Sequence, residues 1–439
     1  MQWTNPPHGN RIDQSSLGRE RNRIDAMIRF PRRYAMRCIE PKAFPTAVRH
    51  GLPARGNTGG LSVAHGGLLG AVTVAWACAC MASGDGKLDP DTATRANASV
   101  QKALAYLVAT QRPDGGWEAF GDSHPAITAL VVKAIAQDRD YGPKHPAVEK
   151  GLAFVLRYVQ PDGGVYVEGE GMPNYHTSVA LMALASVKNS GHAETIKNAQ
   201  DCLKRLQWDD GEGHERSSAW YGGAGYGTGK RPDLSNTQLM LEALRDSGLP
   251  ADDPTYQKAL VFIGRCQMFG STNDQPFSEG ASEGGFVYSP ANGGESKAGT
   301  EVVGDRPRLR SYGSMTYAGF KSMLYARVDR DDPRVKAAVE WIRGNYTLDA
   351  NPNMPSAQSK EGLFYYYHVF ARAMSAWGEE RVIDLAGASH PWRRELCEKL
   401  ASLQRDDGSW INEADRWFEG NPHLVTAYAV LALQTAMGD

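Results

Sequence analysis

Residues 111–117 read QRPDGGW, and related phrases return as QPDGG at 160–164 and QRDDGSW at 404–410. In each phrase a Gln ends an apolar run and Asp-Gly or Asp-Asp-Gly follows, which is the composition of a helix stop and a turn. A single element of a fold needs such a turn once. Its return therefore predicts an array of repeated units.

After residue 95 the chain repeats an apolar helix, a Gln or an equivalent residue, a Gly-rich turn, and a second, more apolar helix. We expect the first helices to begin near Val100, Val148, Ile196, Tyr256, Val335 and Arg393, and to stop at Gln111, Gln160, Gln207, Gln267, Tyr346 and Gln404. Repeats of about 50 residues, lengthened where loops are inserted, are typical of stacked supersecondary units.

The two kinds of helix differ in apolar pattern. First helices such as VQKALAYLVATQ place apolar side chains three or four residues apart, with Lys and Gln on the opposite face. One face of these helices is therefore expected to be exposed to solvent. Second helices such as ITALVVKAIA and TSVALMALAS are more apolar and need burial on several sides. Six outer and six inner helices in alternation predict a closed double ring, with an open solenoid as the alternative.

The Gln-x-x-Asp-Gly-Gly-Trp turn after an outer helix resembles the repeat of the squalene cyclase and protein prenyltransferase superfamily, whose domains are α/α toroids. The likeness covers roughly residues 95–439. It implies an all-α fold, an (α/α)6 toroid of six outer and inner helix pairs, with the inner-helix entrances gathered around a central cavity. It leaves the reaction open, because toroids host several chemistries.

Composition and charge narrow the functional classes. With 41% hydrophobic and 22% charged residues the chain is an ordinary globular protein. Residues 1–60 hold ten Arg and one Lys against four acidic residues, a net +7, and the remainder carries −9. An acidic main body excludes a nucleic-acid partner there. No CxxC pair occurs, so neither a disulfide framework nor a zinc ribbon is expected.

A segment free of charge follows the basic extension 1–60. Leu61 to Ala82 is an apolar run rich in small residues, with an Ala-x-Ala at Ala77 and Ala79. This pattern is typical of a secretory signal peptide, and we expect export to the periplasm or the medium. A membrane anchor, with association at a membrane surface, is the alternative.

Cyclases of the resembled superfamily that protonate an alkene use a D-x-D-D motif at an inner-helix entrance. Asp329 to Asp332 spell DRDD, but they precede Pro333 and an outer helix, where carboxylates suit a helix start. We therefore expect a structural role for this motif. Asp233, at an inner-helix entrance, is the candidate acid.

The run FYYYH at 364–368 is the least ordinary of the inner-helix entrances. Aromatic faces stabilise cations, and a Tyr or His can move a proton. We therefore predict His368 as a proton acceptor, with Tyr312 and Tyr366 as aromatic stabilisers. An aromatic core is the alternative interpretation.

The resembled prenyltransferases hold zinc with an Asp-x-Cys pair and a later Tyr-His pair at separate entrances. Here Asp122-Ser123-His124 and Tyr175-His176 fall at consecutive entrances, with His in place of the Cys. Asp122, His124 and His176 form a set that is chemically competent for zinc. Ordinary capping by Asp122 is the competing interpretation.

Polar residues at the inner-helix starts are expected to cap free backbone N–H groups: Ser235, Asn236, Thr177, Thr316 and Thr426. The predicted ligand is an isoprenoid or similar lipid in a central cavity with an apolar lining. A polysaccharide lyase or glycosidase is the alternative, with carboxylates beside Trp platforms: Trp117, Trp220, Trp410, Trp417, Glu413 and Asp415. A binding scaffold without catalysis is a third class.

Overall fold

The computed structural model describes residues 88–438. The basic extension 1–60 and the predicted signal or anchor at 61–82 lie outside the described residues. The described helices belong to the compact unit Gly84–Asp439. Within 88–438, none of the helices combines the length and the apolarity that crossing a membrane requires.

Outer and inner helices alternate along the described chain. The outer helices are α2 (Pro90–Ala109), α4 (Pro146–Leu156), α6 (Ala193–Arg205), α8 (Pro254–Cys266), α10 (Pro333–Gly344) and α12 (Trp392–Leu403). The inner helices are α3 (Pro125–Ala136), α5 (Pro173–Val187), α7 (Leu234–Asp246), α9 (Gly313–Tyr325), α11 (Leu363–Trp377) and α13 (Pro422–Met437).

The first outer helix begins ten residues before the predicted start at Val100, and the repeat unit therefore begins before residue 95. Asp89 caps α2 by accepting a hydrogen bond from the backbone N–H of Thr92, and Pro90 takes the first helical position. These are ordinary start signals. The apolar pattern missed them because the first turns of α2 carry mostly polar residues.

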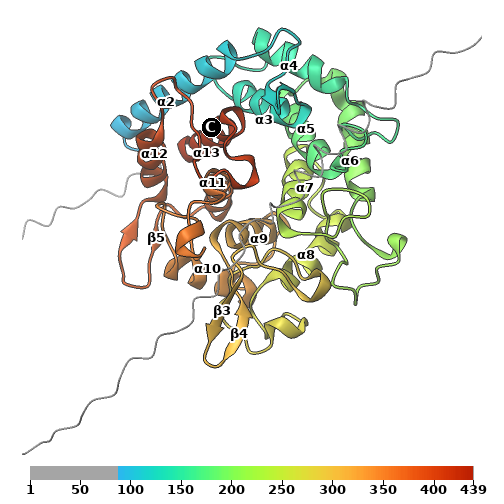
Figure 1. Ribbon diagram of the computed structural model, residues 1–439, viewed down its shortest axis with the longest axis vertical. Helices are drawn as coiled ribbons and strands as arrows, with labels where there is room; N and C mark the ends of the chain where they lie inside the picture. The colour runs from blue at the N-terminus through green and yellow to red at the C-terminus, as the bar shows by residue number, and fades with distance from the viewer. Residues whose placement is uncertain (1–87, 439) are drawn as a thin grey trace, which may run out of the picture. The chain divides into compact units, whose positions relative to one another are not determined.

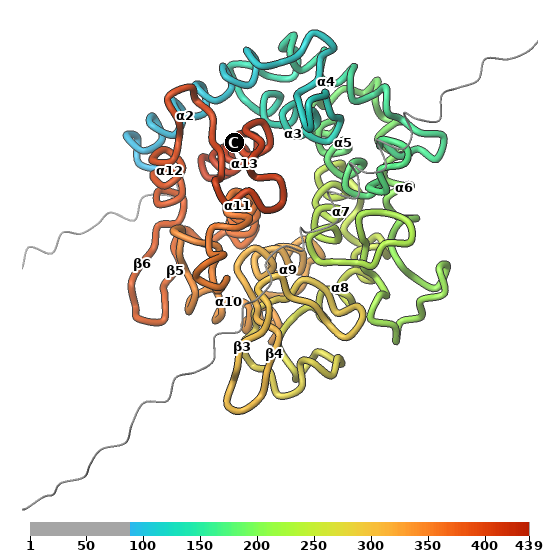
Figure 2. The backbone as a smooth tube through the Cα atoms, in the orientation of Figure 1, coloured from blue at the N-terminus to red at the C-terminus, as the bar shows by residue number. Residues whose placement is uncertain are grey.

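The inner helices form a closed ring (Figure 1). Each contacts the next, from α3 with α5 through to α11 with α13, and α13 returns to contact α3. In the outer layer α12 contacts α2, so the backbone trace runs through its full colour range and meets its own start (Figure 2). The predicted all-α toroid of six helix pairs is confirmed, and the open solenoid is excluded.

Burial explains which helices lie inside. Every residue of α3 is buried, whereas Ala199, Cys202 and Leu203 are the buried residues of α6. A helix that is apolar on all sides must be buried on all sides. A helix with one apolar stripe packs that stripe against the inner helices and leaves its other face in solvent. The predicted assignment of the second helices to the inner layer is confirmed.

In four of the six repeats the Gln fastens the turn to the next outer helix. Gln111 Nε2 donates to the carbonyl of Gly115 in its own turn, at 2.9 Å, and to that of Ala147 in α4, at 2.8 Å. Three other repeats do the same: Gln207 bonds Gly222 and Thr255, Gln267 bonds Gly284 and Arg334, and Gln404 bonds Gly408 and Ser99. Because Ser99 lies in α2, the bond from Gln404 closes the ring.

The Gly of the turn is required by a close approach of two backbones. Gly115 has φ +93°, and a Cβ there would lie 2.5 Å from the carbonyl oxygen of Lys150 in α4. Gly408, with φ +92°, would meet the carbonyl oxygen of Lys102 in α2 at the same distance. A side chain is therefore excluded on both conformational and steric grounds.

Inner-helix threonines bind the turn and do not cap their own helices. Thr128 Oγ1 accepts a hydrogen bond from the backbone N–H of Trp117 at 3.0 Å. The same bond joins Thr177 to Val165, Thr237 to Ala224, Thr316 to Phe286 and Thr426 to Trp410. The predicted capping role is wrong for Thr177, Thr316 and Thr426, and α7 is capped by Asp233 rather than by Ser235 or Asn236.

The fifth repeat lacks both the Gln and the Thr. Two tyrosine hydroxyls of α11 take their place: Tyr366 donates to the carbonyl of Thr347 at 2.8 Å, and Tyr367 donates to that of Leu348 at 2.6 Å. The larger side chains reach the loop directly, so the repeat closes without the Gln.

Three short antiparallel hairpins lie in the loops: β1 (Glu118–Ala119) with β2 (Asp122–Ser123), β3 (Thr300–Val303) with β4 (Arg306–Leu309), and β5 (Val382–Ile383) with β6 (Ser389–His390). The pairing of Ala119 with Asp122 leaves Phe120 and Gly121 as the turn of the first hairpin.

The DRDD motif is structural, as predicted. Asp332 caps the outer helix α10 by accepting the backbone N–H of Arg334 at 2.9 Å, and Asp331 pairs with Lys336 at 2.8 Å. Asp329 accepts the backbone N–H of Asp331. All three carboxylates are used at the start of α10.

Candidate functional site

The inner-helix starts bring hydroxyl groups together around the ring axis. Tyr365 of α11 shares a hydrogen bond of 3.0 Å with Ser235 of α7, and its hydroxyl accepts from Gln238 Nε2 at 3.0 Å. Tyr175 of α5 lies near Tyr428 on α13. Tyr175, Ser235 and Tyr365 are partly exposed. Solvent thus reaches the axis here, and we call Tyr175, Ser235, Tyr365 and Tyr428 the mouth.

Asp233 is a buried carboxyl beside the mouth, with 2% of its surface exposed. It accepts hydrogen bonds from the backbone N–H of Asn236 at 2.8 Å and from Asn236 Nδ2 at 2.9 Å. Burial raises its pKa to about 6, although these bonds and the nearby Arg231 act in the opposite direction. The carboxyl therefore holds a proton at a pH where a surface aspartate does not.

Two phenols lie near Asp233. They belong to Tyr288 and Tyr226, whose pKa values respond to the charge of the Asp233 carboxyl. Tyr288 is 9% exposed and Tyr226 is 39% exposed. Burial, followed by the charge of Asp233, raises the pKa of both phenols, so they stay protonated.

Below the mouth, charged side chains of four inner helices meet in a network that we call the charged belt: Lys133, Glu242, Asp246, Lys321 and Arg372. Lys321 bonds Glu242, and Arg372 Nε lies 2.9 Å from Glu242 Oε1. Asp246 accepts from Arg372 and from Lys133, each at 2.7 Å. The belt thus joins α3, α7, α9 and α11.

The charged belt contradicts the predicted apolar lining of the axis. The side chains of Lys321 and Glu242 are 0% and 1% exposed, so the middle of the axis is packed and charged. Burial favours the neutral form of each group, but mutual pairing holds the pKa of Glu242 well below its usual range. A long apolar guest has no apolar path past these groups.

Two pockets of the described residues lie outside the ring axis. One, of 520 Å³, is bounded by charged residues of α6 and α8, including Lys204 and Lys258. The other, of 220 Å³, lies among α9, α10 and α11 beside the β5 strand, against Phe320 and Trp377. Neither contains a residue predicted from the sequence to be functional.

His368 lies between the mouth and the belt. Its Nε2 is 3.9 Å from Glu242 Oε1, and its ring stacks on Tyr428 with centroids 5.5 Å apart. Its Nδ1 has no hydrogen-bond partner among the described residues. Burial lowers the pKa to about 3, so the imidazole is neutral but a weak base.

The two predicted aromatic stabilisers are placed differently. Tyr312, at 2% exposure, precedes α9 close to Asp233, whose charge contributes to the raised pKa of the phenol. Tyr366 turns away from the axis: its hydroxyl bonds Thr347, and its ring packs against Tyr317 and Phe370. The structure thus gathers Asp233, Tyr312 and His368 around the axis and leaves Tyr366 between the helix layers.

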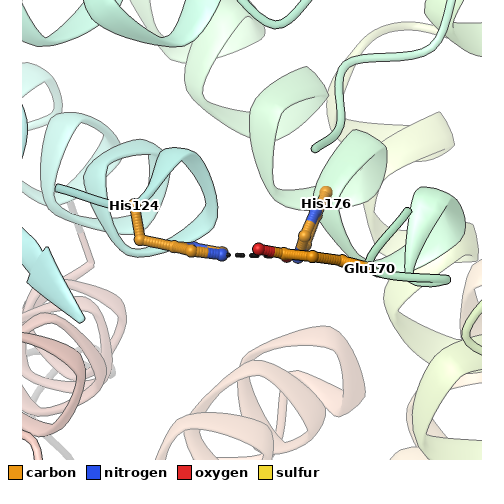
Figure 3. Close-up of side chains that lie close together, drawn as sticks. All are labelled: His124, Glu170 and His176. Carbon is orange, nitrogen blue, oxygen red and sulfur yellow. Dashed lines mark hydrogen bonds and ion pairs between the residues drawn. The ribbon is translucent and has the colours of Figure 1, made fainter. Parts of the chain in front are cut away.

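His124, Glu170 and His176 meet between the starts of α3 and α5 (Figure 3). Glu170 Oε2 lies 3.2 Å from His124 Nε2 and 3.5 Å from His176 Nε2. Asp122 is not part of this cluster, because it sits exposed on β2. Glu170, on the loop before α5, was not predicted from the sequence.

The Nδ1 atom of each of these histidines accepts a backbone hydrogen bond, which favours a proton on Nε2. His124 Nδ1 accepts the backbone N–H of Ala126 at 3.3 Å, and His176 Nδ1 accepts that of Val167 at 3.5 Å. A neutral imidazole that accepts at Nδ1 carries its proton on Nε2, the atom that a metal would need. Each Nε2 instead faces Glu170. His145 caps α4 through the same Nδ1 bond, to Ala147, with no such cluster beside it.

Two of the four tryptophans named for the glycosidase interpretation have a structural role. Trp117 and Trp410 are fully buried, and their indole N–H groups donate to the carbonyls of Leu107 and Leu400 in the outer helices. Asp415 accepts the backbone N–H of Gly420 at 2.7 Å. The predicted packing role of Trp117 and Trp410 is confirmed.

Sequence reasoning missed the charged belt although a signal was present. Four inner-helix runs each carry charge within an otherwise apolar stretch, at Lys133, Glu242, Lys321 and Arg372. Such residues are almost never fully buried unless they are paired, so four of them in buried runs indicate mutual pairing. Tyr226 and Tyr288 come from long insertions and carry no comparable signal.

No protein-family model and no curated protein matches the chain. Among solved structures it is similar to the type II terpene cyclase MstE from Scytonema in complex with geranylgeranyl dihydroxybenzoate, at 15% identity over 80% of this chain and 99% of that one, with a TM-score of 0.47. A protein from Actinoplanes is 18% identical over 78% and 99% of the two chains, with a TM-score of 0.45. A glycosidase in complex with glucose is 13% identical over 80% and 99%, with a TM-score of 0.42.

The arrangement of the helices defines the class of protein. The described residues form a closed α/α toroid of six helix pairs, of the kind that the resemblance to the squalene cyclase and prenyltransferase repeat implied. The described site is a hydroxyl-lined mouth with a buried acid above a charged belt.

Proposed function

We propose that the protein is an acid-base enzyme that binds an isoprenoid or a similar lipid at the mouth and protonates its polar end. The observation that carries this proposal is Asp233, a buried carboxyl with a pKa of about 6 at an inner-helix start. A carboxyl that keeps its proton close to neutral pH can serve as a general acid.

The neighbouring phenols offer Asp233 a route to a ligand. Asp233 is itself 2% exposed, so we assign the transfer of its proton to Tyr288 and Tyr226, which lie near it. Each phenol passes one proton on as it accepts another, and the carboxylate that remains is stabilised by Asn236. His368 stacks on Tyr428 beside this site, but burial lowers its pKa to about 3, so it is not assigned the returning proton.

The charged belt limits how a lipid can be held. Because Lys321 and Glu242 seal the middle of the axis, the polar end of the ligand lies at the mouth and the hydrocarbon must lie outside the axis. Tyr rings from α5, α11 and α13 offer both aromatic faces and hydroxyls to such an end.

Mass spectrometry of small molecules extracted from protein purified without detergent tests the proposal. We expect a polyprenoid or related lipid from the wild type, and a chromatographically distinct precursor of it from the Asp233→Asn variant. The Asp122→Asn variant is the matched control, because Asp122 lies on an exposed hairpin. An oligosaccharide, or no retained compound, overturns the proposed ligand; the same compound in all three proteins overturns the role of Asp233.

A further inference from the structure

Three aromatic residues adopt a backbone conformation that bulky side chains avoid. Phe120, Trp417 and Phe418 have φ of 57°, 60° and 67°. In this left-handed region the Cβ crowds the following carbonyl oxygen, which raises the conformational free energy. Gly has no Cβ and avoids this cost, and for Asn or Asp the cost is smaller. Three such residues in two loops are too many to attribute to one difficult turn.

The first of them stands where another residue type is expected. Phe120 and Gly121 form a two-residue hairpin turn with positive φ at both positions, which favours Asn-Gly or Asp-Gly. Phe120 is nevertheless 51% exposed, and Trp417 is 38% exposed. The ring of Phe120 lies against that of Phe418, with centroids 4.3 Å apart. We call Phe120, Trp417 and Phe418 the aromatic rim.

The aromatic rim is tied to the mouth by hydrogen bonds. Phe418 directly precedes Glu419, whose carboxylate accepts the backbone N–H of Tyr365 at 2.7 Å. On the other side, Asn421 Nδ2 donates to the carbonyl of Glu118 in the Phe120 hairpin at 3.0 Å. The rim therefore spans the starts of α3, α11 and α13 and adjoins Tyr365.

We infer that the aromatic rim binds the hydrocarbon part of the ligand whose polar end lies at the mouth. The inference rests on the proposed function and adds the place where the chain of the lipid lies. Strained, exposed apolar residues persist where they serve binding, since the fold alone favours other residues there. Three rings offer far less than the roughly 800 Å² per partner of a stable protein interface, which favours a small apolar ligand.

Substitution of the strained residues separates binding from packing. Phe120→Asn and Phe418→Asn place a residue that tolerates positive φ, so we expect the midpoint of thermal unfolding to rise by about 1–3 °C. Loss of an aromatic contact should weaken the binding of tritiated farnesol, measured by equilibrium dialysis, by roughly tenfold. If Phe120 and Phe418 served folding alone, replacing them would lower the midpoint of thermal unfolding.

Val302→Thr is the control, because Val302 is 74% exposed on the distant hairpin β3. If both rim variants bind farnesol as tightly as the wild type, the aromatic rim does not bind the hydrocarbon. The proposed function is unaffected by that result. If the variants have a lower melting temperature and also bind farnesol more weakly, the rim residues serve packing. The inference that they bind the ligand is then wrong. Failure of the wild type to bind farnesol removes both the rim and the proposed lipid.

Discussion

At the scale of single residues, Asp233 serves two purposes that act on its pKa in opposite directions. As the cap of α7 it accepts N–H bonds, which favour the carboxylate. Burial favours the neutral acid and prevails, raising the pKa to about 6. The helix start is therefore less stable at neutral pH than below it, which is acceptable where the proton is needed for function.

The pH dependence of stability tests this assignment. Because the pKa of Asp233 is higher in the folded than in the unfolded chain, its contribution is present at low pH and is lost as pH rises through about 6. We expect the free energy of unfolding of the wild type, relative to Asp233→Asn, to fall by about 2 kcal/mol between pH 4.5 and 7.5. Urea denaturation at the two pH values measures this difference.

Glu419, whose pKa burial raises to about 7, titrates in both proteins and cancels in the comparison. Asp122→Asn provides a second reference, since Asp122 is exposed. A difference between wild type and Asp233→Asn that stays constant across this range would show that Asp233 is ionised throughout, and the proposed acid would be lost.

At the scale of elements, the turn after an outer helix joins three helices at once in four of the six repeats. Its Gln reaches the next outer helix, its Gly lets that helix approach, and a Thr of the inner helix holds its backbone. Gln160 departs from this pattern: its Nε2 bonds the carbonyls of Tyr158 and Tyr166, both within its own turn. The second repeat thus provides an internal reference for the others.

Gln267 and Gln160 make a matched pair for mutation. Gln267 is 0% exposed, and its removal takes the side-chain donor from the carbonyls of Gly284 and of Arg334 in α10, so Gln267→Ala should lower the free energy of unfolding by about 2–4 kcal/mol. Gln160→Ala removes bonds that are local and partly exposed, and about 1 kcal/mol is expected. Equal losses in urea denaturation would mean that the bridge to the next outer helix contributes nothing.

At the scale of the whole molecule, the charged belt decides what kind of toroid this is. Ring closure brings α3, α7, α9 and α11 within reach of one another, and their charged side chains meet on the axis. A buried ion pair is costly to break because one charge is left uncompensated, although the intact pair adds little net stability. The belt should thus matter more for specifying the packed axis than for raising stability.

A double-mutant cycle on the belt tests this view. Lys321→Met leaves the buried Glu242 with Arg372 as its remaining close cationic partner and should lower the free energy of unfolding by about 3–5 kcal/mol. Adding Glu242→Met should restore part of that loss, because Arg372 keeps Asp246. Purely additive losses in denaturant titrations would show that Lys321 and Glu242 act independently.

The sequence by itself determined the repeat, the alternation of outer and inner helices, and the placement of Asp233 at an inner-helix start. These follow from local signals, namely the spacing of apolar residues and the composition of a turn, which act over a few residues. It also indicated the structural role of the DRDD motif, since Pro333 and a helix follow it directly.

Tertiary structure alone decided what faces the axis. Lys133 and Asp246, or Lys321 and Glu242, are about 80 to 110 residues apart in the chain, and only ring closure makes them partners. The same holds for Glu170, which replaces Asp122 beside the two histidines, and for Tyr366, which faces the outer layer. A periodic pattern indicates that a face is buried, but the groups it meets there come from segments remote in sequence.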